Sequence, residues 1–141
     1  MAILKTQYNG SFELTGYLNA DGYISADGYL IANTMLVTPN AGLTLSNGSN
    51  DNIAITKSFN RITGPTGSFG ISGFAGGIDG MQLAVFNTTS QAMTITNEAT
   101  SSTANRITTL TGADIVLRIG TSCASFIYDG TTSRWIVTST N

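Results

Sequence analysis

The sequence predicts an all-β protein, with a β-sandwich or jelly-roll-like body and an extended N-terminal arm. Of its 141 residues, 41% are hydrophobic and only 10% are charged, a balance that is unlike that of disordered chains. The remainder is rich in Thr, Ser, Asn and Gly, which suit exposed sheet faces and tight turns. Short alternating runs separated by Asn-Gly and Asp-Gly dipeptides complete the pattern of an all-β domain.

Strands are expected in order along the chain. The runs at 42–46 and 52–57 flank NGSND and predict a hairpin, and the runs at 82–87 and 92–97 flank TTSQ and predict a second one. Further alternating runs follow at 106–110, 113–119, 124–129 and 134–139. This regular spacing favours a sandwich or jelly roll over βαβ units. We place a soft boundary near residue 58, between an arm at 1–58 and a compact β domain at 59–141.

Two stretches of this series lack plain alternation. Residues 99–106, ATSSTANR, are the one segment with helical potential, and we interpret them as a loop. Glycine recurs at every third position from Gly64 to Gly76, as in collagen. Phe69 and Ile71 are poor collagen residues, however, so we predict a turn followed by a Gly-rich strand with both side chains facing inward.

A hexapeptide occurs three times at residues 16–33, in the order GYLNAD, GYISAD and GYLIAN. In an extended segment, the tyrosines of the three copies lie on one face and the aliphatic residues on the other. If Asp-Gly turns the chain every six residues, the copies instead form three sides of one coil. The apolar residues of the two stripes are Tyr17, Leu18, Tyr23, Ile24, Tyr29 and Leu30.

One reading makes these hexads ordinary strands of the same sandwich. We prefer the alternative, that other chains supply the neighbours of the two apolar stripes, because a repeat that cannot bury its apolar face alone needs stacked neighbours. Burying one tyrosine stripe is worth several kcal/mol, at roughly 25 cal/mol per Å². The six apolar residues of the hexads are therefore the predicted contacts with other subunits or with a different protein.

The residue types of common catalytic and metal sites are scarce. The chain has no histidine, which removes Ser-His and Cys-His arrangements. Cys123 is the single cysteine and lies in a β pattern without a basic neighbour, so we expect a sheltered structural thiol. Four of the eight acids, Asp21, Asp27, Asp79 and Asp129, precede glycine, where they favour turns. We therefore predict a non-enzymatic protein without a cofactor, a catalytic residue or a bound metal.

Charge and hydropathy bear on the partners. The net charge is −2 and the six basic residues are scattered along the sequence. A basic surface that could bind the phosphate backbone of a nucleic acid is therefore not expected. No apolar stretch approaches the ~20 residues of a membrane helix. We expect neither nucleic acid nor membrane among its partners.

Five stretches in the C-terminal half carry a resemblance: GPTGSF (64–69), FAGGIDGMQLAVFN (74–87), TITNEATSSTANRI (94–107), TGADIVL (111–117) and FIYDGTTSRWIV (126–137). They resemble modules of phage virion proteins, both head-decoration proteins and the tips of tail fibres. The resemblance implies a compact β fold, usually a homotrimer, without catalytic residues. It also implies synthesis in the host cytoplasm and a place in the virion, on the outer capsid surface for a decoration protein.

Two virion roles follow from this resemblance. A decoration, or cement, protein binds the major capsid protein and stabilises the phage head. A short fibre or receptor-binding protein instead recognises a host surface glycan or protein. The shortness of the chain favours the decoration protein. Trp135 and Tyr128 could form a sugar-stacking platform, but their alternation with Val137 and Phe126 fits core packing better.

Overall fold

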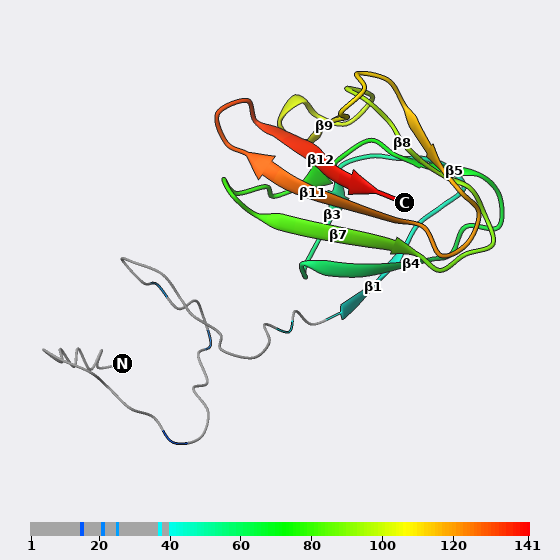
Figure 1. Ribbon diagram of the computed structural model, residues 1–141, viewed down its shortest axis with the longest axis horizontal. Helices are drawn as coiled ribbons and strands as arrows, with labels where there is room; N and C mark the ends of the chain where they lie inside the picture. The colour runs from blue at the N-terminus through cyan, green and yellow to red at the C-terminus, as the bar shows by residue number, and fades with distance from the viewer. Residues whose placement is uncertain (1–14, 16–20, 22–24, 26–36, 38–39) are drawn as a thin grey trace, which may run out of the picture. The chain divides into compact units, whose positions relative to one another are not determined.

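The computed structural model describes residues 40–141, together with Thr15, Asp21, Ser25 and Val37. Residues 37–141 form one compact unit. Its described part is nearly all β-structure, which confirms the all-β prediction (Figure 1).

The strands within residues 40–141 are short, and several have only two or three residues. They are β1 (Asn40–Thr44), β2 (Gly48–Asn50), β3 (Ile53–Ala54), β4 (Phe59–Thr63), β5 (Phe69–Ile71), β6 (Phe74–Ala75), β7 (Gln82–Asn87), β8 (Met93–Ile95), β9 (Ile107–Thr108), β10 (Ile115–Leu117), β11 (Cys123–Asp129) and β12 (Arg134–Thr140). A 3-10 helix, η1 (Thr103–Asn105), precedes β9. It lies inside the stretch predicted as a loop, so the helical potential of that stretch is realised.

The first eight strands form a short β-solenoid. Strands three apart in sequence pair in parallel, so that β1, β4 and β7 belong to one sheet and β2, β5 and β8 to a second. β3 and β6 form a third, two-stranded sheet, again in parallel. The chain thus visits three sheets in turn and returns to the first sheet one strand further along, as in β-helices. We call β1–β3 the first coil, β4–β6 the second, and β7–β8 the start of the third.

The last third of the chain covers the third coil with reversed strands. β11 pairs with β7 and β10 pairs with β8, both antiparallel, and β12 then pairs with β11. The six-stranded sheet therefore has the order β1-β4-β7-β11-β12-β9, and the four-stranded sheet the order β10-β8-β5-β2. Figure 1 shows β12, β11, β7, β4 and β1 following one another across the larger sheet.

The structure corrects four expectations. The run at 42–46 makes no hairpin with 52–57, because β1 pairs with β4 in the next coil. The run at 82–87 makes none with 92–97, because β7 and β8 belong to different sheets. Parallel coils also differ from the antiparallel Greek keys that make up a jelly roll. Finally, the strands of residues 40–57 belong to the compact unit, whose boundary lies between 36 and 37 instead of near 58.

Apolar columns run across the coils and form the core. Phe69 of the second coil lies in register with Met93 of the third, and Met93 with Leu117 of β10. All three side chains are buried. Ile71 and Ile95 form a neighbouring pair of the same kind. The prediction that Phe69 and Ile71 face inward is therefore confirmed.

Aromatic rings close the core beneath β11 and β12. Trp135 and Phe74 meet edge-on, as do Phe74 and Phe126, and Tyr128 packs against Trp135 in the same way. Edge-to-face pairs of this kind contribute about 0.5–1.5 kcal/mol beyond their buried area. Trp135 is fully buried and Tyr128 nearly so, which confirms their prediction as core residues.

Candidate assembly surface

All three sheets end at the first coil. β1 is the edge of the six-stranded sheet, β2 is the edge of the four-stranded sheet, and β3 is one of two strands in the third sheet. On their outer side these strands pair with no other strand within residues 40–141. We call these three strand edges together the coil-1 edge. Free N–H and C=O groups at such an edge are a template for pairing with another chain.

The coil-1 edge carries neither of the residue types that most often protect a free strand, a charge or a proline. Its strands have the sequences NAGLT, GSN and IA, without a charged residue or a proline. Natural edge strands are commonly blunted by Lys, Pro or a bulge. The backbone of the first coil is therefore presented in a form suited to strand addition.

Two asparagines hold the first coil rigidly on the second. The Asn47 side-chain oxygen accepts hydrogen bonds from the backbone N–H groups of Thr66 at 2.8 Å and Gly67 at 2.9 Å. The Asn50 amide donates to the carbonyl of Ser46 at 2.9 Å and to that of Gly70 at 3.1 Å. The bond to Ser46 closes a turn within the first coil, and the other three join the first coil to the second. The coil-1 edge is therefore a fixed surface.

The carboxylate of Asp51, which follows β2, also links the first coil to its neighbours. Asp51 Oδ1 accepts hydrogen bonds from the hydroxyls of Ser49 at 2.7 Å, Ser72 at 2.5 Å and Thr100 at 2.6 Å. These bonds, that from Ser72 above all, lower the pKa of Asp51. Three donors on one oxygen keep this carboxylate ionised and occupied, and they tie the first coil to the second and to the loop before η1.

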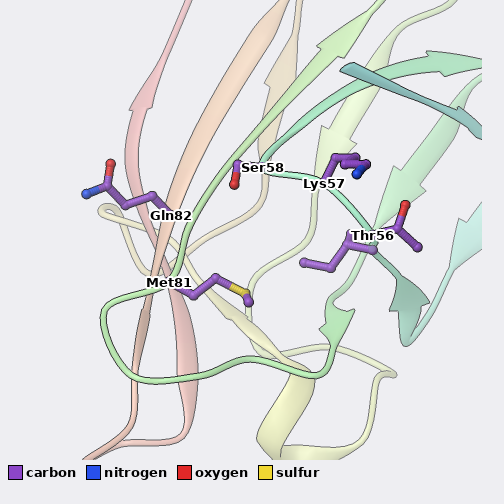
Figure 2. A pocket seen from close by; sticks show the side chains of 6 residues that line it. Thr56, Lys57, Ser58, Met81 and Gln82 are labelled. Carbon is purple, nitrogen blue, oxygen red and sulfur yellow. The ribbon is translucent and has the colours of Figure 1, made fainter. Parts of the chain in front are cut away.

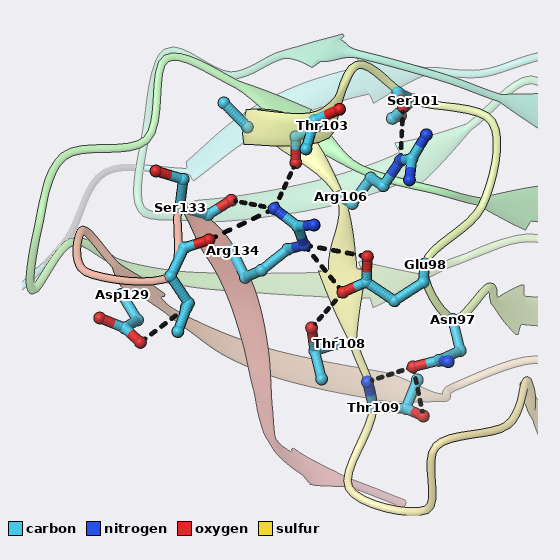
Figure 3. Close-up of polar contacts among 12 residues, drawn as sticks. Asn97, Glu98, Ser101, Thr103, Arg106, Thr108, Thr109, Asp129, Ser133 and Arg134 are labelled. Atoms are coloured by element: carbon cyan, nitrogen blue, oxygen red, sulfur yellow. Dashed lines mark hydrogen bonds and ion pairs between the residues drawn. The ribbon is translucent and has the colours of Figure 1, made fainter.

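A second polar cluster is built around Glu98 and Arg134 (Figure 3). Arg134 Nε donates to Glu98 Oε1 at 2.8 Å and Oε2 at 2.9 Å, and the Thr108 hydroxyl donates to Oε1 at 2.5 Å. A guanidinium nitrogen of Arg134 also donates to the carbonyl of Thr103 at 2.8 Å. Burial raises the pKa of Glu98, but the bonds from Arg134 and Thr108 outweigh it and the pKa is lowered. The cluster links β12, β9 and η1.

A small pocket lies where the first and second coils turn toward the next (Figure 2). It is lined by Ile55, Thr56, Lys57, Ser58, Met81 and Gln82 and has a volume of about 130 Å³. Ligand pockets usually have about 300–1,000 Å³. This pocket is therefore too small for a drug-sized ligand.

The remaining candidates for chemistry are structural. Cys123 is half-buried, and burial raises the pKa of its thiol, which disfavours the reactive thiolate. In the part of the chain that the structure describes, no three residues of the His, Cys, Asp or Glu types come together to hold a metal ion. Nor is any helix there long and apolar enough to cross a membrane.

The predicted contact residues of the hexads, Tyr17, Leu18, Tyr23, Ile24, Tyr29 and Leu30, lie outside the described residues. The coil-1 edge was not predicted, because the run at 42–46 was expected to pair with that at 52–57. A usable signal is present in the spacing of the runs. The strands of the first and second coils recur after 19 residues from Asn40 to Phe59 and after 21 from Gly48 to Phe69.

No protein-family model matches the chain, and no curated protein matches it at a significant level.

Proposed function

We propose that this chain is a non-enzymatic structural component of a bacteriophage virion, a homotrimeric decoration protein that binds the major capsid protein and stabilises the head. It is made in the host cytoplasm and then bound to the outer capsid surface. The observation that supports this proposal best is the coil-1 edge, whose three strands carry no charge and whose backbone is suited to strand addition.

The use of polar groups supports the proposal as well. The carboxylates of Asp51 and Glu98 are engaged by hydroxyl donors or by Arg134, and their pKa values are lowered. A general acid near neutral pH needs a raised pKa. Both carboxylates therefore act as ties between loops and strands.

The test is a binding assay with undecorated phage heads. The full chain should cosediment with them and raise the temperature at which they release DNA. A variant with Tyr17, Tyr23 and Tyr29 all replaced by Ser should lose this binding while keeping the circular dichroism of the body. Equal binding by this variant would contradict the role of the hexads, and no binding by the parent chain would contradict the proposed function.

One surface favours a second candidate, a short fibre or receptor-binding protein. Phe59 and Phe86 are half-buried on strands β4 and β7, and the Arg61 guanidinium carbon lies 5.2 Å and 5.6 Å from their ring centroids. An aromatic surface with a cation can bind a glycan of the host surface. Binding to host cells, lost in Phe59→Ala, without binding to phage heads would select this candidate.

A further inference from the structure

We propose that the coil-1 edge binds the hexad segment, residues 16–33, of a neighbouring subunit, which adds one more coil to the solenoid. The inference deepens the proposed function and rests on it, because it assigns the contact that joins the subunits of the homotrimer.

The core itself is incomplete on the side of the first coil. Leu43, Leu45 and Ile55 of this coil are only partly buried, although they pack against the core. Leu43 lies in register with Ile62 of the second coil, which is fully buried because it has a strand on both sides. An additional coil would give Leu43 the same environment. At roughly 25 cal/mol per Å², covering such side chains is a substantial driving force.

The hexad segment matches the dimensions of such a coil. Each coil has three sides, and the repeat from the first to the second coil is 19 residues at Asn40 and 21 at Gly48. The three hexads together have 18 residues and carry turn-favouring Asp-Gly at Asp21 and Asp27. One hexad per side therefore provides one strand for each of the three sheets.

The chemistry of the two surfaces also agrees. The strands of the coil-1 edge carry no charge, and Asp21 and Asp27, at the hexad corners, are the only charged residues of 16–33. Aliphatic residues alternate with polar ones in the hexads, so Leu18, Ile24 and Leu30 share a face that can continue the columns of the core.

The hexad segment has an aliphatic face and a tyrosine face, and this arrangement favours a neighbouring subunit as the chain that supplies it. When the aliphatic stripe faces a solenoid core, alternation directs Tyr17, Tyr23 and Tyr29 to the outside. Three exposed tyrosines on a single subunit would be an apolar surface of the kind that marks an interface. If the segment is exchanged between subunits, it lies at the interface of the trimer. The compact unit of another subunit then covers the tyrosines.

A disulfide experiment with full-length chains tests the assignment. In a Cys123→Ser background, Asn19→Cys in the first hexad is combined with Gly42→Cys on β1, where a side chain meets nothing within 4 Å. Oxidation should give covalently linked dimers and trimers of this double variant, or of variants with the edge cysteine at Asn40 or Thr44 instead. The matched control combines Asn19→Cys with Val116→Cys, which is exposed on β10 at the far edge of the four-stranded sheet, and should stay unlinked.

The outcomes separate the inference from the proposed function. A disulfide that forms only within single chains, or linkage equal to that of the control, overturns the inference even if the chain is a trimer that binds phage heads. Linkage between chains without head binding supports the inference and overturns the proposed function.

A charge placed on the edge gives an independent measurement. Gly42→Lys should weaken trimer formation about tenfold or more by analytical ultracentrifugation, whereas Gly42→Gln, of similar length, should not. Unchanged association of the Lys variant contradicts the assignment.

Discussion

The indole Nε1 of Trp135 donates a hydrogen bond to the backbone carbonyl of Phe74 at 2.8 Å, and the two rings meet edge-on with centroids 5.6 Å apart. Trp135 lies on β12, and Phe74 lies on β6 in the second coil. This contact therefore joins β12, near the C-terminus, to the second coil of the solenoid.

Trp135→Phe should destabilise the fold by roughly 2–4 kcal/mol, because it leaves the buried Phe74 carbonyl without a donor and opens a cavity. Urea unfolding followed by circular dichroism measures the change. Tyr128→Phe is the control. It removes only the hydroxyl bond to the Ala104 carbonyl, at 3.0 Å, and should cost about 1 kcal/mol. An equal loss of unfolding free energy in both variants would contradict a larger contribution from the indole hydrogen bond than from the Tyr128 hydroxyl.

Gly73→Ala should be among the most damaging small substitutions. An added Cβ would overlap the backbone carbonyl of Asn105, and backbone cannot move aside as a flexible side chain can. We expect a loss of roughly 3 kcal/mol or more. Gly42→Ala, where a Cβ meets nothing, should stay within about 0.5 kcal/mol of the parent protein. Thermal unfolding of the two variants side by side measures the difference, and equal Tm values would contradict a steric role for Gly73.

Glu98→Gln should lower Tm at pH 7 but not at strongly acidic pH. The pKa of Glu98 is lower in the folded protein than its usual value of 4.5, so its ionised form adds stability above that pH. This stability is lost as pH falls through the folded pKa. The Tm difference between parent and variant should thus shrink on acidification. A difference that is the same at pH 7 and pH 2 would mean that Arg134 does not act on the ionised form.

Asp51→Ala should cost about 1–3 kcal/mol, because the hydroxyls of Ser49, Ser72 and Thr100 lose their shared acceptor and Ser72 is buried. Asp51→Asn keeps an oxygen at this place and should cost less. Chemical unfolding at pH 7 distinguishes the two. If the two substitutions are equally mild, the cluster does not hold the first coil.

The sequence was informative where a local property decides the structure. Alternation identified strands at 82–87, 124–129 and 134–139, and it assigned Trp135 and Tyr128 to the core. The partners of those strands were not accessible in this way. Asn47-Gly48 favours a tight hairpin locally, yet Asn47 instead accepts hydrogen bonds from Thr66 and Gly67, about twenty residues away. A long-range contact overrides the local preference.

The candidate surface was out of reach for the same reason. A free edge is defined by the strand that is missing beside it, and this depends on the whole pairing order. The hexads could be singled out from the sequence because a repeat is visible without a fold. Their proposed binding surface became visible only once β1, β2 and β3 were known to end three sheets together.

The repetition of coils has a consequence for how such a chain can change length. A stretch such as 59–83 contributes one strand to each of three sheets, and the residue that follows it, Ala84, lies in register with its first residue, Phe59. Duplicating or deleting a stretch of this size would lengthen or shorten the molecule by one layer while leaving the C-terminal cover intact. The number of layers in this architecture can therefore change during evolution. A protein with a single enclosed core cannot gain or lose a layer in this way.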